Sequence, residues 1–182
     1  MMAHPARHHD EARKLQPRVI QGSGAEHDQG SSLCLWWKRG EQNQAIGRSR
    51  GGRTTKIHGL SDPLCRPVVL HLTAGQDADI TATPDVLALA PAMRALIADK
   101  GYDGDNLRAQ IVDCGAKPVI PNKSNRVVVH PFNKRAYKGR NVIERCFCRL
   151  KDFRRIATRY DKLARNFLAA VHLAAAVAYW LN

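Results

Sequence analysis

Two carboxylates in this sequence have neighbours that suit phosphate chemistry. Asp99 ends the apolar run at residues 94–98, and a strand there would present the carboxylate to a crevice at its carboxyl end. Glu144 lies among cationic residues in a stretch with an apolar helical face. The two could share a divalent metal ion, because carboxylate oxygens are ligands that Mg²⁺ prefers. Each also has a plainer interpretation, Asp99 as a turn residue before Gly101 and Glu144 as the ion-pair partner of an arginine.

Cations lie around Glu144 at spacings that a helix would place on one face. Arg140 is four residues before it and Lys151 is seven residues after it, which places them one and two turns away. Side chains so placed could bind phosphates beside a metal ion. The net charge is +13, and residues 122–165 hold fourteen Lys and Arg against three Asp and Glu, whereas residues 57–121 hold five against eight. This distribution predicts a polyanionic partner such as nucleic acid.

The elements that must position these residues follow a mixed α/β pattern. Alternating and apolar runs predict a β-hairpin over residues 54–73 and short strands at 94–98 and 117–121. Helical spacing predicts four helices, at residues 79–90, 105–114 (closed by Gly115), 138–152 and 161–180. A basic loop at residues 122–137 precedes the helix that carries Glu144.

Residues 1–53 keep no helical or strand period, and we predict that they are poorly ordered. The five cysteines have spacings typical of neither a zinc site nor a disulfide framework, so we expect reduced thiols. The most apolar run, at residues 163–181, contains Arg165 and His172, which favours a buried helix over a membrane span. We expect no membrane partner.

Four segments together resemble insertion-sequence transposases of the DDE type, particularly the group named after insertion sequence five. The motif Tyr137-x2-Arg140-x3-Glu144-x6-Lys151 is similar to that family's signature around its last catalytic acid. The segment Ala-Asp-Lys-Gly-Tyr-Asp at residues 98–103 resembles its second-acid motif, and residues 47–58 and 154–162 resemble two further segments. The motifs keep the family's order, and the resemblance covers residues 41–182.

The resemblance implies a ribonuclease-H-like mixed sheet flanked by helices. It also implies phosphoryl transfer on double-stranded DNA, at element ends and at a target, with Mg²⁺ or Mn²⁺ held by three carboxylates. Asp99 would be the second acid and Glu144 the third, both of them metal ligands, and Tyr137, Arg140 and Lys151 would bind DNA. Self-association, or mixed assembly with full-length transposase, and a place at the nucleoid in a bacterial cytoplasm are further implications.

The sequence departs from the family upstream of residue 47. The family's first acid lies on the first strand, in a motif of the form apolar-Asp-Ser/Gly-Thr, and no acid before residue 47 follows an apolar run with strand character. We therefore expect a catalytic portion at residues 47–182 that lacks its first strand, preceded by a non-family segment at residues 1–46. A shifted reading frame upstream of Gly40, in a decayed element, would explain this. Translation of the upstream nucleotides in the other two frames tests that hypothesis.

Three functions remain open at this point. The first is a transposase impaired by the missing first acid. The second is a non-catalytic DNA-binding remnant that interferes with full-length copies. The third is an unrelated basic module, such as an RNA-binding accessory protein, which a separation of Asp99 and Glu144 beyond about 15 Å would favour, because carboxylates that share a metal pair lie much closer.

Overall fold

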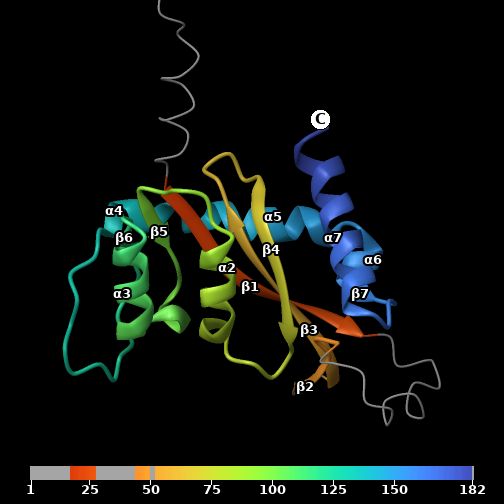
Figure 1. The fold of residues 1–182 in the computed structure, drawn as a ribbon, viewed down its shortest axis with the longest axis horizontal. Coiled ribbons are helices and arrows are strands. Elements are labelled where there is room, and N and C mark those ends of the chain that lie inside the picture. Colours follow the sequence, from red (N-terminus) through yellow and green to blue (C-terminus); the bar gives the residue numbers. More distant parts are fainter. Residues whose placement is uncertain (1–16, 28–43, 50–51, 182) are drawn as a thin grey trace, which may run out of the picture.

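The computed structural model describes residues 17–27, 44–49 and 52–181, which form one mixed sheet with helices on both faces (Figure 1). The strands are β1 (Pro17–His27), β2 (Gly47–Ser49), β3 (Gly52–Ser61), β4 (Pro67–Ala74), β5 (Ala95–Ile97), β6 (Lys117–Val119) and β7 (Thr158–Arg159). The helices are α2 (Thr83–Ala88), α3 (Asp105–Asp113), α4 (Lys134–Tyr137), α5 (Asn141–Lys151), α6 (Arg154–Ala157) and α7 (Ala164–Tyr179).

Strand β1 lies at the centre of the sheet. The main path runs β2-β3-β1-β5-β6, with β4 paired to β3 and β7 paired to β1. β1 is antiparallel to β3 and parallel to β5, which in turn is parallel to β6. The expected architecture, a mixed α/β sheet flanked by helices, is confirmed.

The expectation that the first strand is missing is wrong, because residues 17–27 form β1. Glycine and short polar residues make this segment a poor strand by local propensity. It forms a strand because neighbouring strands pair with both of its edges. β3 pairs with it from Val19 to Glu26, and β5 and β7 pair with its two ends. Much of the remaining N-terminal segment lies outside the described residues.

The other predicted elements are found close to their expected bounds. β3 and β4 form the expected hairpin. Helix α3 ends as predicted before Gly115, whose φ of +74° is the left-handed conformation that glycine adopts at low cost. The helix expected at residues 138–152 begins with a 3₁₀ turn at Lys138–Arg140 before α5.

Two hydrophobic clusters cover the two faces of the sheet. Val19 and Ile97 belong to the cluster on the side of α5 and α7, together with Ile143 and Phe147. Their chain neighbours Ile20 and Leu96 belong to the other cluster, on the side of α2 and α3. This alternation follows from the two-residue period of a strand, and it fixes the face to which each position of β1 and β5 points.

Helix α7 is the most apolar helix in the chain, and its inner side packs on the sheet. Phe167, Val171, Ala174, Ala175 and Ala178 are its buried residues. Among the described residues, no helix is both long and apolar enough to cross a membrane.

Candidate functional site

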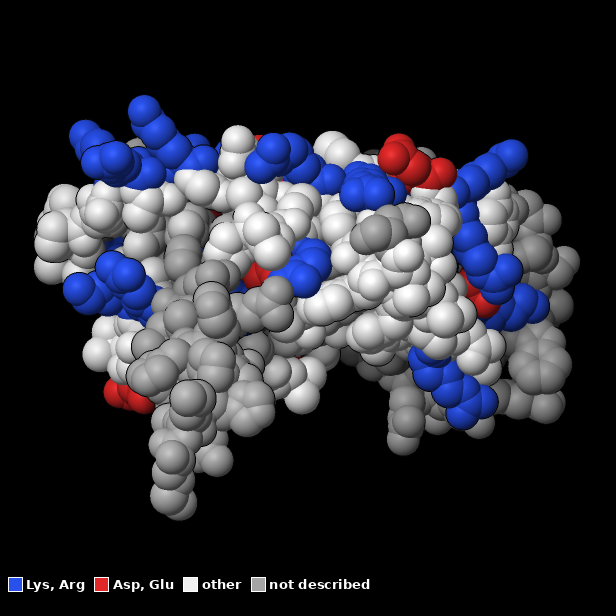
Figure 2. Space-filling model, turned by 90° about the horizontal axis from the view of Figure 1, so that it is seen from above, with Lys and Arg blue, Asp and Glu red and all other residues white. Residues whose placement is uncertain are grey.

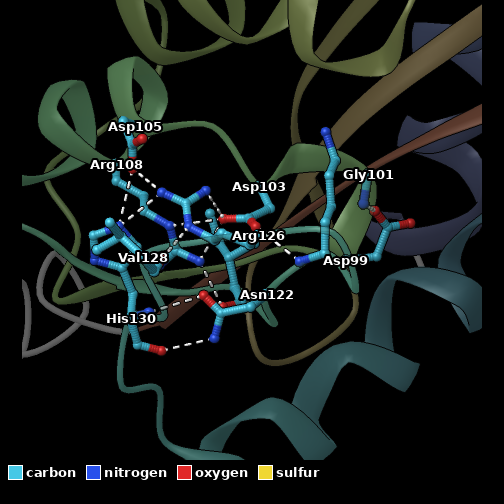
Figure 3. Close-up of polar contacts among 11 residues, drawn as sticks. Asp99, Gly101, Asp103, Asp105, Arg108, Asn122, Arg126, Val128 and His130 are labelled. Carbon is cyan, nitrogen blue, oxygen red and sulfur yellow. Dashed lines mark hydrogen bonds and ion pairs between the residues drawn. The ribbon is translucent and has the colours of Figure 1, made fainter.

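Asp99 lies just beyond the carboxyl end of β5. Its backbone is extended, and its Oδ1 accepts a hydrogen bond of 2.7 Å from the backbone N–H of Gly101 (Figure 3). A Cβ at position 101 would come within 2.9 Å of Oδ1, so glycine leaves room for the carboxylate over the turn. Asp99 follows Ile97 by two residues and continues its extended backbone, and we infer that it faces the α5 side of the sheet.

Gln21 lies on the adjacent strand at the matching position. The parallel register pairs Val19 with Ile97, so the residues two positions further along are Gln21 and Asp99. Gln21 also shares the face of Val19, which packs on the α5 side. Its Oε1 is buried and has no hydrogen-bond partner among the described residues. A buried amide oxygen without a donor is uncommon, because it loses its hydration without compensation.

Helix α5 crosses β1 on this face. In the 3₁₀ turn just before α5, a Cβ on Gly139 would lie 3.6 Å from Cδ1 of Ile97 on β5. Further along, Cζ of Phe147 lies 2.9 Å from the position that a Cβ on Gly59 would occupy, and Gly59 is paired with Gln21 across the β1–β3 ladder. The helical segment therefore runs from above β5 to above β3, and β1 lies between them.

Glu144 lies on that segment, between the two contact points. Its Oε1 forms an ion pair of 2.6 Å with Nη1 of Arg140, and both side chains are partly exposed. The guanidinium of Arg140 also lies 5.8 Å from the ring centre of Tyr137, which packs edge-on against Phe132. Tyr137, Arg140 and Glu144 thus form one contiguous row that begins at α4 and continues along α5.

Asp99 and Gln21 follow the paired ends of β5 and β1, and the helix that carries Glu144 crosses the same face of the sheet. The sequence interpretation missed Gln21 because residues 17–27 were not recognised as a strand. A signal was present: Ile20-Gln21-Gly22-Ser23 has the form apolar-x-Gly-Ser, with glutamine at the position of the acid in the motif apolar-Asp-Ser/Gly-Thr. The residue type alone hid it.

These residues do not fit a site for two Mg²⁺ or Mn²⁺ ions. Within the described ranges, no group of three or more His, Cys, Asp or Glu side chains is arranged to hold a metal ion. Asp99 and Glu144 supply two carboxylates, and the third neighbouring position holds a neutral amide whose oxygen is buried and unpaired. Glu144 is already paired with Arg140.

A buried ionic cluster lies beside Asp99 (Figure 3). The side chain of Asp103 is fully buried and accepts hydrogen bonds from Arg108, from Arg126 and from the backbone N–H of Lys123, at 2.8 to 3.0 Å. Burial alone would raise the pKa of Asp103, but these hydrogen bonds and the charges of the arginines outweigh it and hold the pKa below its usual value. The cluster ties the loop after β6 to the turn that carries Asp99.

Cationic side chains gather along one margin of the molecule, with few acidic residues among them (Figure 2). Exposed Lys and Arg residues on α4 and α5 include Lys134, Arg135, Arg145, Arg149 and Lys151. The fold therefore groups the positive charge of α4 and α5 next to Arg140 and Glu144.

Comparisons with known proteins identify the family and the relatives of this chain. Residues 20–181 match the family described as the transposase DDE domain. The chain is 36% identical over 130 residues to a protein of Brucella ovis assigned as the transposase of insertion sequence element IS6501, covering 71% of this chain and 99% of that protein. It is 28% identical over 144 residues to the corresponding protein of element IS402 from Burkholderia cepacia, covering 73% of this chain and 65% of that protein.

Among solved structures, a pre-cleavage Mos1 transpososome is similar with a TM-score of 0.38 and 9% identity, covering 93% of this chain and 56% of that one. The family match spans most of the chain, from the middle of β1 to the end of α7. The chain belongs to the transposase DDE domain family.

Proposed function

We propose that this chain is a DNA transposase chain that binds the ends of an insertion sequence and cleaves and transfers DNA strands poorly or not at all. The observation that carries the proposal is the register of β1 on β5: Gln21 lies two residues beyond the Val19–Ile97 pair, as Asp99 does, on the face that α5 covers. Two acids of the expected set share one face of the sheet, and the third position holds an amide.

Asp99 and Glu144 offer two of the three carboxylates that a pair of Mg²⁺ or Mn²⁺ ions would need. A complete set of three carboxylates would hold the metal ions whose charge phosphoryl transfer requires. An amide at position 21 offers one neutral oxygen in place of a charged carboxylate, which lowers the negative charge available to a divalent cation. Gln21 thus accounts for impaired chemistry without any change of fold.

Arg140 would have a second role in DNA binding. In the absence of DNA it neutralises Glu144 at 2.6 Å, and a phosphate could take over its guanidinium because phosphates accept bidentate hydrogen bonds from arginine. The guanidinium lies over the ring of Tyr137, and Lys151 adds a further positive charge at the end of α5. We propose that this row contacts the DNA backbone and so sets affinity rather than base specificity.

The test measures binding and cleavage separately. The probe is a duplex carrying the terminal repeat of the element that encodes the chain. We expect binding by fluorescence anisotropy that weakens steeply as salt rises, and little nicking with Mg²⁺ or Mn²⁺. Arg140→Ala should weaken binding, whereas Arg165→Ala, at an exposed cation on α7, is the matched control. Robust nicking that Asp99→Ala abolishes would overturn the claim of impairment, and absent binding would overturn the function itself.

A second candidate is a non-catalytic DNA-binding remnant that interferes with full-length transposase by mixed assembly. The unpaired Gln21 amide and the ion-paired Glu144 favour it, because both reduce the negative charge of the site. Titrating this chain into an excision assay of the active full-length enzyme separates the two candidates. Inhibition that Arg140→Ala relieves supports the remnant. Self-association and residence at the nucleoid belong to the same proposal.

The non-family origin of the N-terminal segment stays a hypothesis. The family match begins at residue 20, so family-like sequence already includes part of the segment before Gly40. If a frame shift created residues 1–46, another frame of the upstream nucleotides encodes an Asp-Ser-Thr-like strand. If no other frame does, Gln21 arose by substitution.

A further inference from the structure

A short loop beside Asp99 carries three adjacent valines into solvent. Val127, Val128 and Val129 are 96%, 66% and 69% exposed. Contiguous β-branched apolar side chains in water are unfavourable for the isolated chain, and such exposure typically marks an interaction site. The loop lies between β6 and α4, at the end of the molecule that carries α3 (Figure 1).

The loop is braced from within. Asn122 and His130 exchange hydrogen bonds at its neck, with Nδ2 donating to the His130 carbonyl at 2.8 Å and the His130 N–H donating to Oδ1 at 2.9 Å. Inside the loop, Nε of Arg126 donates to the carbonyl of Val128 at 2.6 Å, and Nη1 reaches Asp103 at 2.9 Å. The valines are therefore held in place before any partner arrives, which lowers the entropic cost of binding.

The position and the charge of the loop indicate its partner. The N–H of Lys123 donates to Asp103, four residues after Asp99, so the loop starts next to the candidate site. Residues 121–135 contain four Lys and Arg and no Asp or Glu. Arg126 is paired with Asp103 and Asp105, so Lys123 in the loop and Lys134 and Arg135 at the start of α4 supply the positive charge. A partner that suits this loop has an anionic surface and an apolar interior, as duplex DNA has with its phosphates and stacked bases. Two copies of the loop meeting each other would instead bring like charges together.

We propose that Val127–Val129 form a wedge that enters a base step of the DNA bound at the Asp99–Glu144 face and unstacks it. Apolar side chains that enter base steps in this way kink the duplex, and the unstacking is offset by the contacts that the bend permits. A duplex opened beside the site would present its backbone to Asp99 and Glu144. The inference rests on the proposed DNA binding.

The test uses duplexes with 2-aminopurine placed at successive positions of the terminal repeat, because its fluorescence rises when it is unstacked. We expect a rise of several-fold at one or two positions. The triple variant Val127→Ser, Val128→Ser, Val129→Ser should abolish the rise, weaken binding by about tenfold and leave the salt dependence unchanged, because no phosphate contact is removed. Val112→Ser, at a 58% exposed valine on α3, is the matched control.

Asn122→Ala is the second variant. It keeps the three valines but removes the hydrogen bonds between Asn122 and His130 that hold the two ends of the loop together. We expect a smaller fluorescence rise with unchanged salt dependence. Binding by anisotropy without a rise at any position, or a rise that survives the triple variant, would overturn the wedge while leaving the proposed function intact. A triple variant that alters only the oligomeric state would also overturn it, in favour of a protein contact. Absence of DNA binding removes both proposals together.

Discussion

Gln21→Asp is the substitution that tests the candidate site most directly. The oxygen at this position is buried without a partner among the described residues, and the β1–β5 register, extended by two residues, places Gln21 next to Asp99. In the absence of metal, a carboxylate there loses hydration and is repelled by Asp99, which costs about 1–3 kcal/mol. For a chain of 182 residues, about 2–4 °C of melting temperature corresponds to each kcal/mol. We therefore expect Gln21→Asp to melt about 3–10 °C below the wild type in EDTA.

Divalent cations should reverse that loss. With a third carboxylate, the set can hold a cation, and cation at about 100 times its dissociation constant stabilises the folded state by about 2.7 kcal/mol. In melting experiments with millimolar Mn²⁺ against EDTA, Gln21→Asp should gain about 5–10 °C. The wild type should gain little. Sensitised Tb³⁺ luminescence measures the same difference without heating.

Two variants show whether the gain comes from the proposed set. Gln21→Leu keeps the site neutral and should not respond to cations. The double variant Gln21→Asp, Asp99→Ala should lose the cation-induced rise in melting temperature, because positions 21 and 99 together again hold only one carboxylate. An equal cation response of the wild type and Gln21→Asp, or no destabilisation in EDTA, would refute the placement of Gln21 beside Asp99.

Three further substitutions probe the scaffold. Asp103→Asn leaves two arginines without their buried counter-charge, so it should cost about 3–5 kcal/mol in urea unfolding, against less than about 0.5 kcal/mol for the exposed Asp113→Asn. The pKa of Asp103 is lower in the folded protein than in the unfolded chain. The ionised carboxylate therefore stabilises the fold fully above the unfolded pKa, and this stabilisation is lost as the pH falls through the folded pKa. Asp103→Asn should abolish that dependence of stability on pH. Burial, above all, lowers the pKa of His58 from 6.5 to about 4 in the folded protein. As the pH falls, the unfolded chain takes up the proton first, so the free energy of unfolding should fall by about 3 kcal/mol between pH 6.5 and pH 4. His58→Gln should make stability nearly independent of pH in this range, and an unchanged pH dependence would show that His58 is not its cause. Gly59→Ala would bring a Cβ within 2.9 Å of Phe147 and should cost about 1–3 kcal/mol, a cost that a double-mutant cycle with Phe147→Leu should partly remove.

The sequence predicted those parts of the fold whose local pattern agrees with their place in the sheet. The hairpin of β3 and β4, the strand before Asp99 and the helix of Glu144 combine an apolar period with turn or cap residues at their ends. Gly115 ends α3 because glycine tolerates the positive φ that the chain adopts there. The two acids could be named from the sequence because each follows or lies within such a pattern.

The remainder depends on pairing between distant segments. β1 forms because β3 and β5 pair with its two edges. The strand propensity of its own residues does not predict it. The short strand β7 pairs with β1 for the same reason. The local pattern Ile20-Gln21-Gly22-Ser23 marks Gln21 only weakly, and the register of β1 is what relates it to Asp99. The buried contacts of Asp103 with Arg126 likewise join residues that no helical or strand period relates.

The central place of β1 has a consequence for folding during synthesis. β1 leaves the ribosome before its partners, which are β3, β5 and finally β7 at Thr158–Arg159. At about 5–20 residues per second, the wait for the last partner is on the order of ten seconds. During that time the strand is present without its complete ladder, and such high contact order slows folding. The yield of folded chain should therefore depend on chaperones that bind nascent segments, and slower elongation should lengthen the period in which β1 is open to mispairing.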